Sequence, residues 1–154
     1  MTDWQLTIDC ANPARQVAFW APVLGYEVQP APEGHATWND WYRSVGVPEG
    51  ELDLSGDGTD RIIDPTGRGP RIWFQVVPEP KGVKNRLHLD IFPGGGRSVP
   101  RDERVRRVEA TVAQLVAAGA SIHRRFPEDF DTDRDRDHHF VVMQDPEGNE
   151  FCVS

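Results

Sequence analysis

Cysteine and long apolar runs are the two features that this sequence most clearly lacks. Two cysteines occur among its 154 residues, and both lie in short apolar stretches, so a disulfide framework is not expected. This usage suits a reducing cytosol, and Cys10 is interpreted as a small core residue. The sequence has no run of about 18 apolar residues, and its first residues lack the basic and apolar regions of a secretion signal. We therefore expect a soluble, cytoplasmic protein.

Basic charge is also scarce. Lysine and arginine together number 17 against 25 acidic residues, which gives a net charge of -8 and a pI near 5.0. Nucleic acids and anionic membranes are bound through basic patches that displace counterions, so this composition disfavours both kinds of partner. A small molecule or another protein is the expected partner. A chain of this length forms one domain, or two small halves that share a core.

What the sequence does contain is a strictly alternating stretch, 86–91, with a histidine in its middle. A strand would send its alternating side chains to opposite faces, with Leu87, Leu89 and Ile91 on one face and Arg86, His88 and Asp90 on the other. The apolar face is predicted to be core. The polar face is either a site for chemistry or an ordinary solvated surface.

Other stretches show regular patterns of the same quality. Residues 4–10 alternate, which predicts a strand with Trp4, Leu6, Ile8 and Cys10 on its apolar face. Asn12 and Pro13 are typical of a helix start, and Gly25 can end that helix. A second helix is predicted from Ser98 or Pro100 to Gly119, with an apolar stripe of Val105, Val108, Val112, Leu115 and Val116. Further strands are predicted at 26–28, 71–77, 120–123, 140–143 and 150–153.

Between residues 29 and 70 the chain is rich in Pro, Gly and Asp. Its firm strand candidate runs from about 36 to 47, where Trp38, Trp41 and Tyr42 are expected to pack in a core rather than to grip a ligand. The 46–69 connection is interpreted as a surface lid or a mobile loop with one weak strand near 51–54. Residues 78–82 are interpreted as a hinge between two halves.

Three motifs that could carry a site are interpreted as plain structure. The glycines at 94–96 lack the Lys and Ser or Thr of a phosphate-binding loop. The Asp-rich segment 127–137 lacks the Gly and closing Glu of a calcium loop, so an exposed turn is expected there. His138 and His139 are adjacent, and neighbours in a strand point to opposite sides, so both are expected at the surface.

The sequence contains an internal repeat. Asp64-Pro65-Thr66-Gly67 recurs 81 residues later as Asp145-Pro146-Glu147-Gly148, and the same offset lays 6–9 on 87–90. Each half is thus predicted to contain a strand, a helix, and then several strands that end in a tight turn and a last strand.

The repeat carries recognisable motifs: 8–13 with Phe19-Trp20 and Leu24-Gly25-Tyr26, then 74–79, 84–90 and 145–153. In these, the chain resembles the vicinal oxygen chelate superfamily of glyoxalases, bleomycin-resistance proteins and extradiol dioxygenases, and most closely its small glyoxalase-like members. The resemblance implies an α+β fold with one glyoxalase-like domain over 1–154. Two βαβββ modules, about 1–80 and 84–154, would form a cupped, mostly antiparallel sheet with the helices outside.

The resemblance also implies where a metal would bind, at the first and last strands of each module. Carried over by strand position, the candidates are Gln5 (or Thr7), Gln75, His88 and Cys152, with Glu150 on the same face as Cys152. Metal-using relatives place glutamates where this chain has Gln75 and Cys152. One imidazole with two neutral amides offers little to a divalent cation, so we expect no metal cofactor. If a metal is bound, its ligands are Gln5, Gln75, His88 and Glu150.

Without a metal, these residues could still transfer a proton or bind a ligand. His88 can exchange a proton near neutral pH, and Asp90 or Glu150 could orient it. The predicted catalytic residues are His88 and Glu150. The predicted ligand-binding residues are Gln5, Trp73, Gln75, Asp90 and Cys152. Alternatively, these polar groups satisfy one another around buried water.

Three functions therefore stay open. The chain is a lyase, isomerase or dioxygenase that acts on a small oxygenated molecule, or it sequesters a ligand without chemistry, as bleomycin-resistance relatives do. In the third possibility, side chains fill the concave face of the cupped sheet, and the protein is a structural relic of the fold with no ligand. The fold does not decide among them, because one fold supports many functions. A homodimer is compatible with each.

Overall fold

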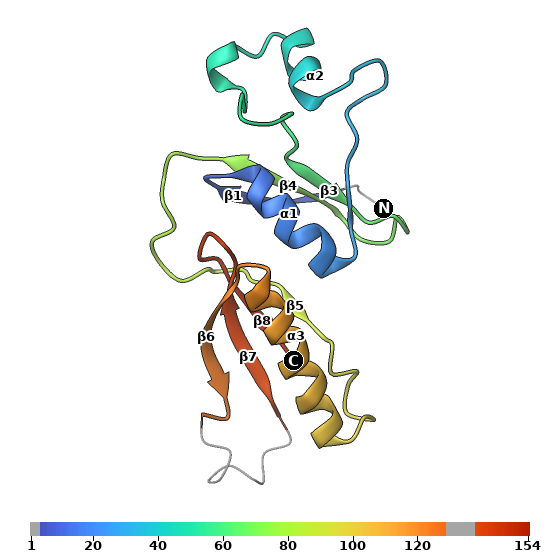
Figure 1. Ribbon diagram of the computed structural model, residues 1–154, viewed down its shortest axis with the longest axis vertical. Helices are drawn as coiled ribbons and strands as arrows, with labels where there is room; N and C mark the ends of the chain where they lie inside the picture. Colours follow the sequence, from blue (N-terminus) through green and yellow to red (C-terminus); the bar gives the residue numbers. More distant parts are fainter. Residues whose placement is uncertain (1–3, 129–137) are drawn as a thin grey trace. The chain divides into compact units, whose positions relative to one another are not determined.

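The computed structural model describes residues 4–128 and 138–154 and has an α+β fold (Figure 1). The chain divides into two compact units, 1–80 and 81–154, and each contains its own four-stranded sheet. The unit boundary falls inside the 78–82 segment. The turn predicted at 127–137 lies largely outside the described residues. Within the described part, every helix is too short or too polar to cross a membrane.

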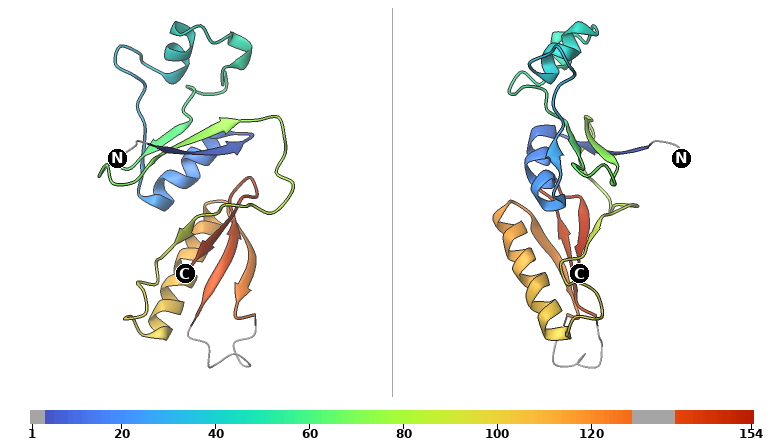
Figure 2. Two further views of the ribbon diagram at one scale, coloured as in Figure 1. Left: turned by 180° about the vertical axis from the view of Figure 1, so that it is seen from behind. Right: turned by 90° about the vertical axis from the view of Figure 1, so that its right-hand side faces the viewer.

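The first unit is a four-stranded sheet with a helix on one face (Figure 2). Its elements are β1 (Gln5–Cys10), α1 (Pro13–Leu24), β2 (Glu27–Val28), α2 (Trp38–Ser44), the 3-10 helix η1 (Glu49–Glu51), β3 (Arg61–Ile63) and β4 (Arg71–Val76). The strand order is β1-β4-β3-β2, with β1 parallel to β4 and the other pairs antiparallel. The core between sheet and helix contains Trp20, Ile62, Ile72 and Phe74, all of them buried.

The second unit repeats this plan. Its elements are β5 (Asp90–Ile91), α3 (Arg101–Ala117), β6 (Ser121–Phe126), β7 (Phe140–Gln144) and β8 (Glu150–Val153). The order β5-β8-β7-β6 matches that of the first sheet, again with a parallel pair, β5 and β8. Helix α3 lies along one face of this sheet (Figure 2). The two units thus confirm the predicted pair of βαβββ modules.

Helix α1 forms where the sequence predicts it, and it is capped at both ends by the expected residues. The Asn12 side chain accepts a hydrogen bond from the Arg15 amide at 2.9 Å, and Pro13 is the first residue of the helix. Gly25 ends the helix at a φ of 65°. That φ is in the left-handed region, which costs glycine little. Pro22 is tolerated near the C-terminal end of the helix, and Val17 and Trp20 are buried.

The repeated Asp-Pro-x-Gly sequences form the same turn in both units. Asp64 accepts from the Thr66 amide at 2.8 Å, and Asp145 accepts from the Glu147 amide at 2.9 Å. The glycine that closes each turn has a positive φ. The hydrogen bonds from the Thr66 and Gly69 amides lower the pKa of Asp64 to about 2. The internal repeat of the sequence is therefore a repeat of the structure.

The strand predicted at about 36–47 is wrong, because this segment forms helix α2. The Thr37 side chain accepts from the Asp40 amide at 3.0 Å, and the Asp40 carboxylate accepts from the Thr37 amide at 3.1 Å. This reciprocal capping box starts the helix. Trp38, Trp41 and Tyr42 then fall three and four residues apart, which is a helical spacing and not an alternating one. Their rings pack edge-on or tilted against one another.

The weak strand predicted near 51–54 is also wrong. Residues 49–51 form η1, and the strand of this region lies later, at β3. The sequence interpretation placed β3 inside a surface connection because Pro, Gly and Asp surround it on both sides. Its Ile62 is fully buried, and it hydrogen-bonds with both β2 and β4, so tertiary pairing defines this strand.

Both strands predicted from alternation are shorter than expected. Trp4 precedes β1 and is 67% exposed, and β5 begins only at Asp90, which leaves Leu87 81% exposed. Leu87 is therefore not a core residue. The reason is the length of the partner: β8 begins at Glu150, and its register places Cys152 opposite Asp90, so residues before His88 have no strand beside them.

His139 is buried, in contrast to the surface position predicted for it. Its Nε2 lies 3.0 Å from Oε1 of Glu109, whose carboxylate also pairs with Arg125. Burial lowers the pKa of His139, and the positive charges of Arg101 and Arg125 lower it further. The Glu109 carboxylate raises this pKa but does not outweigh the other effects. His138 is exposed, as expected. In the second helix Val108, Val112 and Leu115 are buried, whereas Val116 is exposed.

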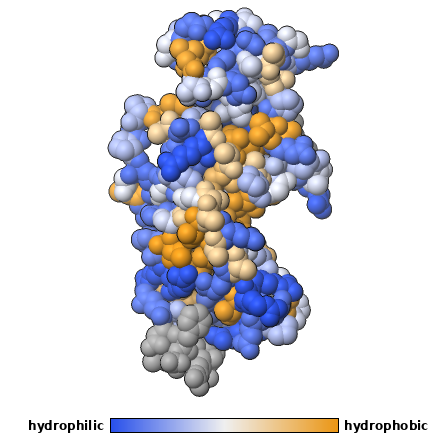
Figure 3. All heavy atoms as spheres, viewed as in Figure 1, coloured by the Kyte–Doolittle hydropathy of each residue, from blue (hydrophilic) through white to orange (hydrophobic). Residues whose placement is uncertain are grey.

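Polar residues cover much of the remaining surface. Figure 3 shows hydrophilic residues over a large part of the face in view, with apolar ones between them. This distribution fits a chain of net charge -8.

Candidate functional site

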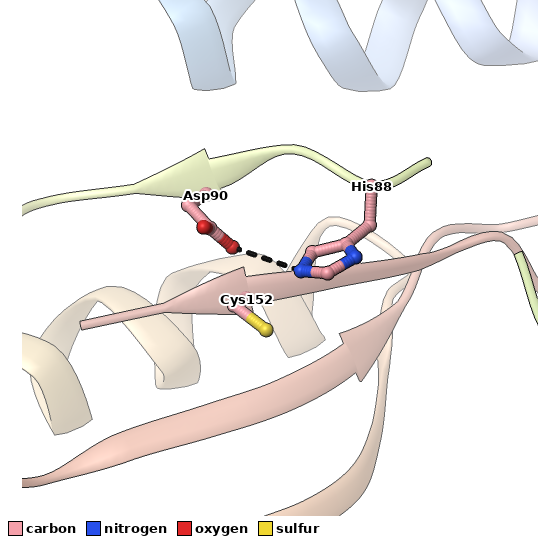
Figure 4. A group of neighbouring side chains, drawn as sticks. All are labelled: His88, Asp90 and Cys152. Atoms are coloured by element: carbon pink, nitrogen blue, oxygen red, sulfur yellow. Dashed lines mark ion pairs between the residues drawn. The ribbon is translucent and has the colours of Figure 1, made fainter. Parts of the chain in front are cut away.

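His88, Asp90 and Cys152 gather on the open face of the second sheet (Figure 4). Asp90 and Cys152 are register partners on β5 and β8, and His88 precedes β5 by two residues, so alternation sends all three side chains to one side. One ligand-type atom from each lies within 4.8 Å of the others. The Nε2 of His88 is 3.3 Å from Oδ1 of Asp90, and the two side chains are 39% and 47% exposed.

The cluster favours a protonated thiol. Burial raises the pKa of Cys152, and the charge of Asp90 and its hydrogen bond to the thiol raise it further, against a smaller opposing effect of Lys84. Asp90 thus faces both the imidazole and the thiol. His88 supplies the imidazole of this cluster, whose two ring nitrogens can donate and accept hydrogen bonds.

Glu150 lies on the same strand as Cys152 but serves a different segment. Its carboxylate accepts from the Asn85 amide at 3.0 Å and pairs with the Lys81 ammonium at 3.1 Å. Burial opposes its ionisation, but the Asn85 amide and Lys81 outweigh this effect, so the pKa of Glu150 is lowered. Glu150 therefore holds the chain that leads into β5, and Asp90 is the carboxylate that contacts His88.

In the first unit the structure does not bring the two predicted glutamines together. Gln5 stands opposite Arg71 on the paired strand, whereas Asp9 stands opposite Gln75. Four residues along a strand correspond to about 13 Å. The Gln5 carbonyl oxygen accepts two hydrogen bonds from the Arg71 guanidinium, one of them at 2.8 Å. Gln5 is therefore bound to Arg71 at the opposite end of the β1–β4 pair from Gln75.

Trp73 and Gln75 line a pocket of about 320 Å³ in the first unit. The other lining residues come from α2, η1, the loop before β3, and the neighbouring strand ends; they are Pro13, Asn39, Tyr42, Val47, Glu51, Leu52, Asp53, Gly58, Thr59, Asp60, Phe74 and Val76. The pocket therefore places two of the predicted ligand-binding residues against a helix that the sequence interpretation missed.

Asp60 organises the wall of this pocket. Its Oδ2 accepts from the Tyr42 hydroxyl at 2.6 Å and from the Trp73 indole at 2.8 Å. The Arg61 guanidinium donates to the Tyr42 oxygen at 2.9 Å and stacks over the Trp38 ring at 4.1 Å. Burial and the Asp60 carboxylate raise the pKa of Tyr42 to about 12, so its hydroxyl stays a donor.

Sequence reasoning did not identify Asp60 or Tyr42. The sequence pattern predicts a strand core for Tyr42 and a loop for Asp60. The usable signal was the capping box at Thr37 and Asp40, because it predicts a helix and so turns Tyr42 and Trp38 to the same side.

The residue set implied by metal-using relatives does not fit a metal ion. The Gln5 oxygen is occupied by the positively charged Arg71, Gln75 is four register positions away from it, and Glu150 is held by Lys81 and the Asn85 amide. The nearer donors, His88, Asp90 and Cys152, are of types that zinc accepts, but binding there must first displace a thiol proton whose pKa is raised.

Comparison with known proteins agrees with this fold. A family model described as a glyoxalase-like domain matches residues 5–154. No curated protein matches the chain. A glyoxalase/bleomycin resistance protein/dioxygenase family enzyme from Burkholderia phytofirmans is a structural neighbour at a TM-score of 0.53 and 17% identity, over 99% of this chain and 97% of that chain.

A fosfomycin resistance protein, FosX, from Listeria monocytogenes is another neighbour, at a TM-score of 0.54 and 10% identity, over 99% of this chain and 90% of that chain. That structure holds Mn(II) and a dihydroxypropylphosphonic acid. At these identities the likeness establishes the fold alone. The family model spans nearly the whole sequence, however, and the chain therefore belongs to the glyoxalase-like domain family of the vicinal oxygen chelate superfamily.

Proposed function

We propose that this protein binds a small oxygenated molecule in the Trp73–Gln75 pocket of its first unit. The observation that carries the proposal is the pocket itself, about 320 Å³ in volume. Sites for small molecules have volumes of roughly 300 to 1,000 Å³, with apolar walls and a few placed polar groups. Here Pro13, Leu52 and Val76 supply apolar surface, and Tyr42 and Trp73 supply rings for a partly planar ligand.

Gln75 is the polar group that this pocket offers to a ligand. In the part of the chain that the structure describes, its amide has no hydrogen-bond partner, unlike that of Gln5. An amide both donates and accepts, so it suits a hydroxyl or carbonyl oxygen. Glu51, Asp53 and Asp60 make the lining acidic, which disfavours an anionic ligand.

We further propose that His88 acts, as in a lyase or isomerase, on a small carbonyl compound at the cluster that it forms with Asp90 and Cys152 within the second unit. A proton on its Nε2 is directed at Asp90, and this leaves Nδ1 as the base that removes a proton from a carbon next to a carbonyl. Asp90 stabilises the imidazolium that forms. A dioxygenase reaction is less well supported, because the residue set of metal-using relatives does not fit a metal ion.

Sequestration without chemistry is the second candidate, and the Asp60 network favours it. Asp60 and Tyr42 line the pocket but are hydrogen-bonded to each other, and Asp60 also pairs with Arg61 at 3.5 Å. Groups held in this way shape a pocket without providing a free base.

Catechol, which is planar and carries two hydroxyls, is a suitable probe of the pocket by isothermal titration calorimetry. We expect saturable binding that Gln75→Ala weakens by about tenfold, the loss of one hydrogen bond. Gln114→Ala is the matched control, because Gln114 is exposed on α3 and lies outside the pocket. The binding proposal is rejected if catechol does not saturate the wild type, or if both variants weaken binding equally.

Proton exchange separates conversion from sequestration. Hydroxyacetone in D₂O would lose its carbon-bound protons, as followed by NMR, faster with wild type than with His88→Ala. Equal, background rates with both proteins, combined with unchanged catechol binding, would support sequestration.

A further inference from the structure

A second pocket, of about 180 Å³, lies in the second unit between the start of α3, the chain that follows β5, and the start of β7. Three arginines line it, Arg97, Arg101 and Arg104, together with the rings of His138 and His139. Among the described residues, none of the side chains that line it is acidic. This is a local excess of positive charge in a chain of net charge -8.

Arg97 and Arg101 differ from other arginines of this unit. Within the described residues, neither guanidinium forms a hydrogen bond or an ion pair, and the Nε of Arg101 is buried without a partner. By contrast, Arg106 and Arg107 both pair with Glu103. Buried donors are nearly always hydrogen-bonded, and an unpartnered charged donor is costly. The two guanidiniums therefore have donors available for an anion.

The other walls of the pocket are held in place. The Nε of Arg104 donates to the Val99 carbonyl at 3.1 Å, and the His139 ring is fixed by Glu109 at 3.0 Å. The Gly94 amide donates to a Ser154 oxygen at 3.2 Å. Gly95 and Gly96 have φ values of 84° and 82°, a conformation that only glycine adopts readily, so the loop turns beside Arg97.

We propose that this pocket binds a small oxyanion, a phosphate or carboxylate group, through Arg97 and Arg101. A planar guanidinium presents two parallel N–H donors that match two oxygens of such a group. The volume is below that of pockets for whole drug-sized ligands, so a small ion or one anionic group fits better than a nucleotide. The proposal is independent of the Trp73–Gln75 pocket and of His88.

Titration calorimetry with inorganic phosphate, and separately with acetate, tests the proposal at constant ionic strength. Wild type is expected to bind at least one of these ions saturably, and Arg97→Gln and Arg101→Gln each weaken binding by about tenfold or more. The tighter ion identifies the group, phosphate or carboxylate. Arg106→Gln is the matched control, because Arg106 is on the same helix, 74% exposed, and outside the pocket.

Thermal melts check that the variants are folded and give a second readout. The bound ion should raise the melting temperature of wild type and of Arg106→Gln, but not that of Arg101→Gln. The proposal is overturned if neither ion binds wild type saturably, or if Arg106→Gln loses as much affinity as the two pocket variants.

Discussion

His88 and His139 show how far surroundings separate two identical side chains. His88 is 39% exposed beside Asp90, whereas the His139 side chain is 3% exposed and contacts Glu109. His88→Ala should therefore leave the melting temperature nearly unchanged. His139→Ala removes a buried ring and its hydrogen bond to Glu109 and should cost about 1 to 3 kcal/mol, which is several degrees for a domain of this size.

Thermal melts of both variants test this contrast, beside the hydroxyacetone exchange assay. A large loss of stability in His88→Ala with unchanged exchange would assign His88 a structural role.

The lowered pKa of His139 predicts a pH dependence of stability. The folded protein holds this imidazole neutral, while the unfolded chain protonates it at its ordinary pKa near 6.5. The contribution of neutral His139 to folding stability is thus complete above pH 6.5. It is lost as the pH falls from there towards the lower pKa that His139 has in the folded protein. Wild type should melt lower at pH 5 than at pH 8, and His139→Gln should reduce this difference. An equal difference in both proteins would contradict the prediction.

Cys152 is predicted to be a slow nucleophile, because burial and Asp90 raise its pKa. Asp90→Asn removes the charge and should increase the rate of alkylation by iodoacetamide at pH 8 several-fold, as followed by peptide mass spectrometry. Cys10 is buried and should not compete. Asp9→Asn, an exposed carboxylate on β1, is the control and should leave the rate unchanged. Similar rates in all three proteins would show that burial alone sets the reactivity.

Among the elements, α1 depends on a side chain that the sequence identifies directly. Asn12→Ala removes the bond to the Arg15 amide and should lower stability by about 1 kcal/mol, measured by urea unfolding. Asn12→Asp keeps an acceptor oxygen and should retain most of the stability. A loss as large in Asn12→Asp as in Asn12→Ala would mean that the cap contributes little.

Elements with local signals were predicted better than elements defined by pairing. The apolar spacing and end residues predicted α1 and α3 nearly to the residue. The prediction of a strand in place of α2 was wrong because it relied on the aromatic residues at 38–42, and bulky aromatics favour strands. The capping box at the start of this segment favours a helix, and a helix forms. Strand β3 was missed, because three residues carry too short a pattern to be distinguished from a loop.

For the whole molecule, family membership does not imply glyoxalase activity. The resemblance implies that metal-using relatives have glutamates where this chain has Gln75 and Cys152, and here the Gln5 oxygen accepts hydrogen bonds from Arg71. We therefore expect no turnover of the glutathione hemithioacetal of methylglyoxal at ordinary enzyme rates, on the order of 10 per second, with added nickel or zinc. A spectrophotometric assay at saturating metal tests this, and turnover at that rate would refute it.

The sequence by itself determined the fold class, both long helices, the internal repeat and the strand face that His88 shares with Asp90. These follow from local rules: side-chain alternation, helix capping, and turn residues that act within a few positions of one another. The tertiary structure decided where β5 begins and that the carboxylate facing His88 is Asp90 and not Glu150. It also decided that Asp60 accepts hydrogen bonds from both Tyr42 and Trp73. It also decided that His139 is buried beside a set of arginines. Such contacts join residues far apart in the chain, and their geometry depends on strand register and helix packing, which no local pattern encodes.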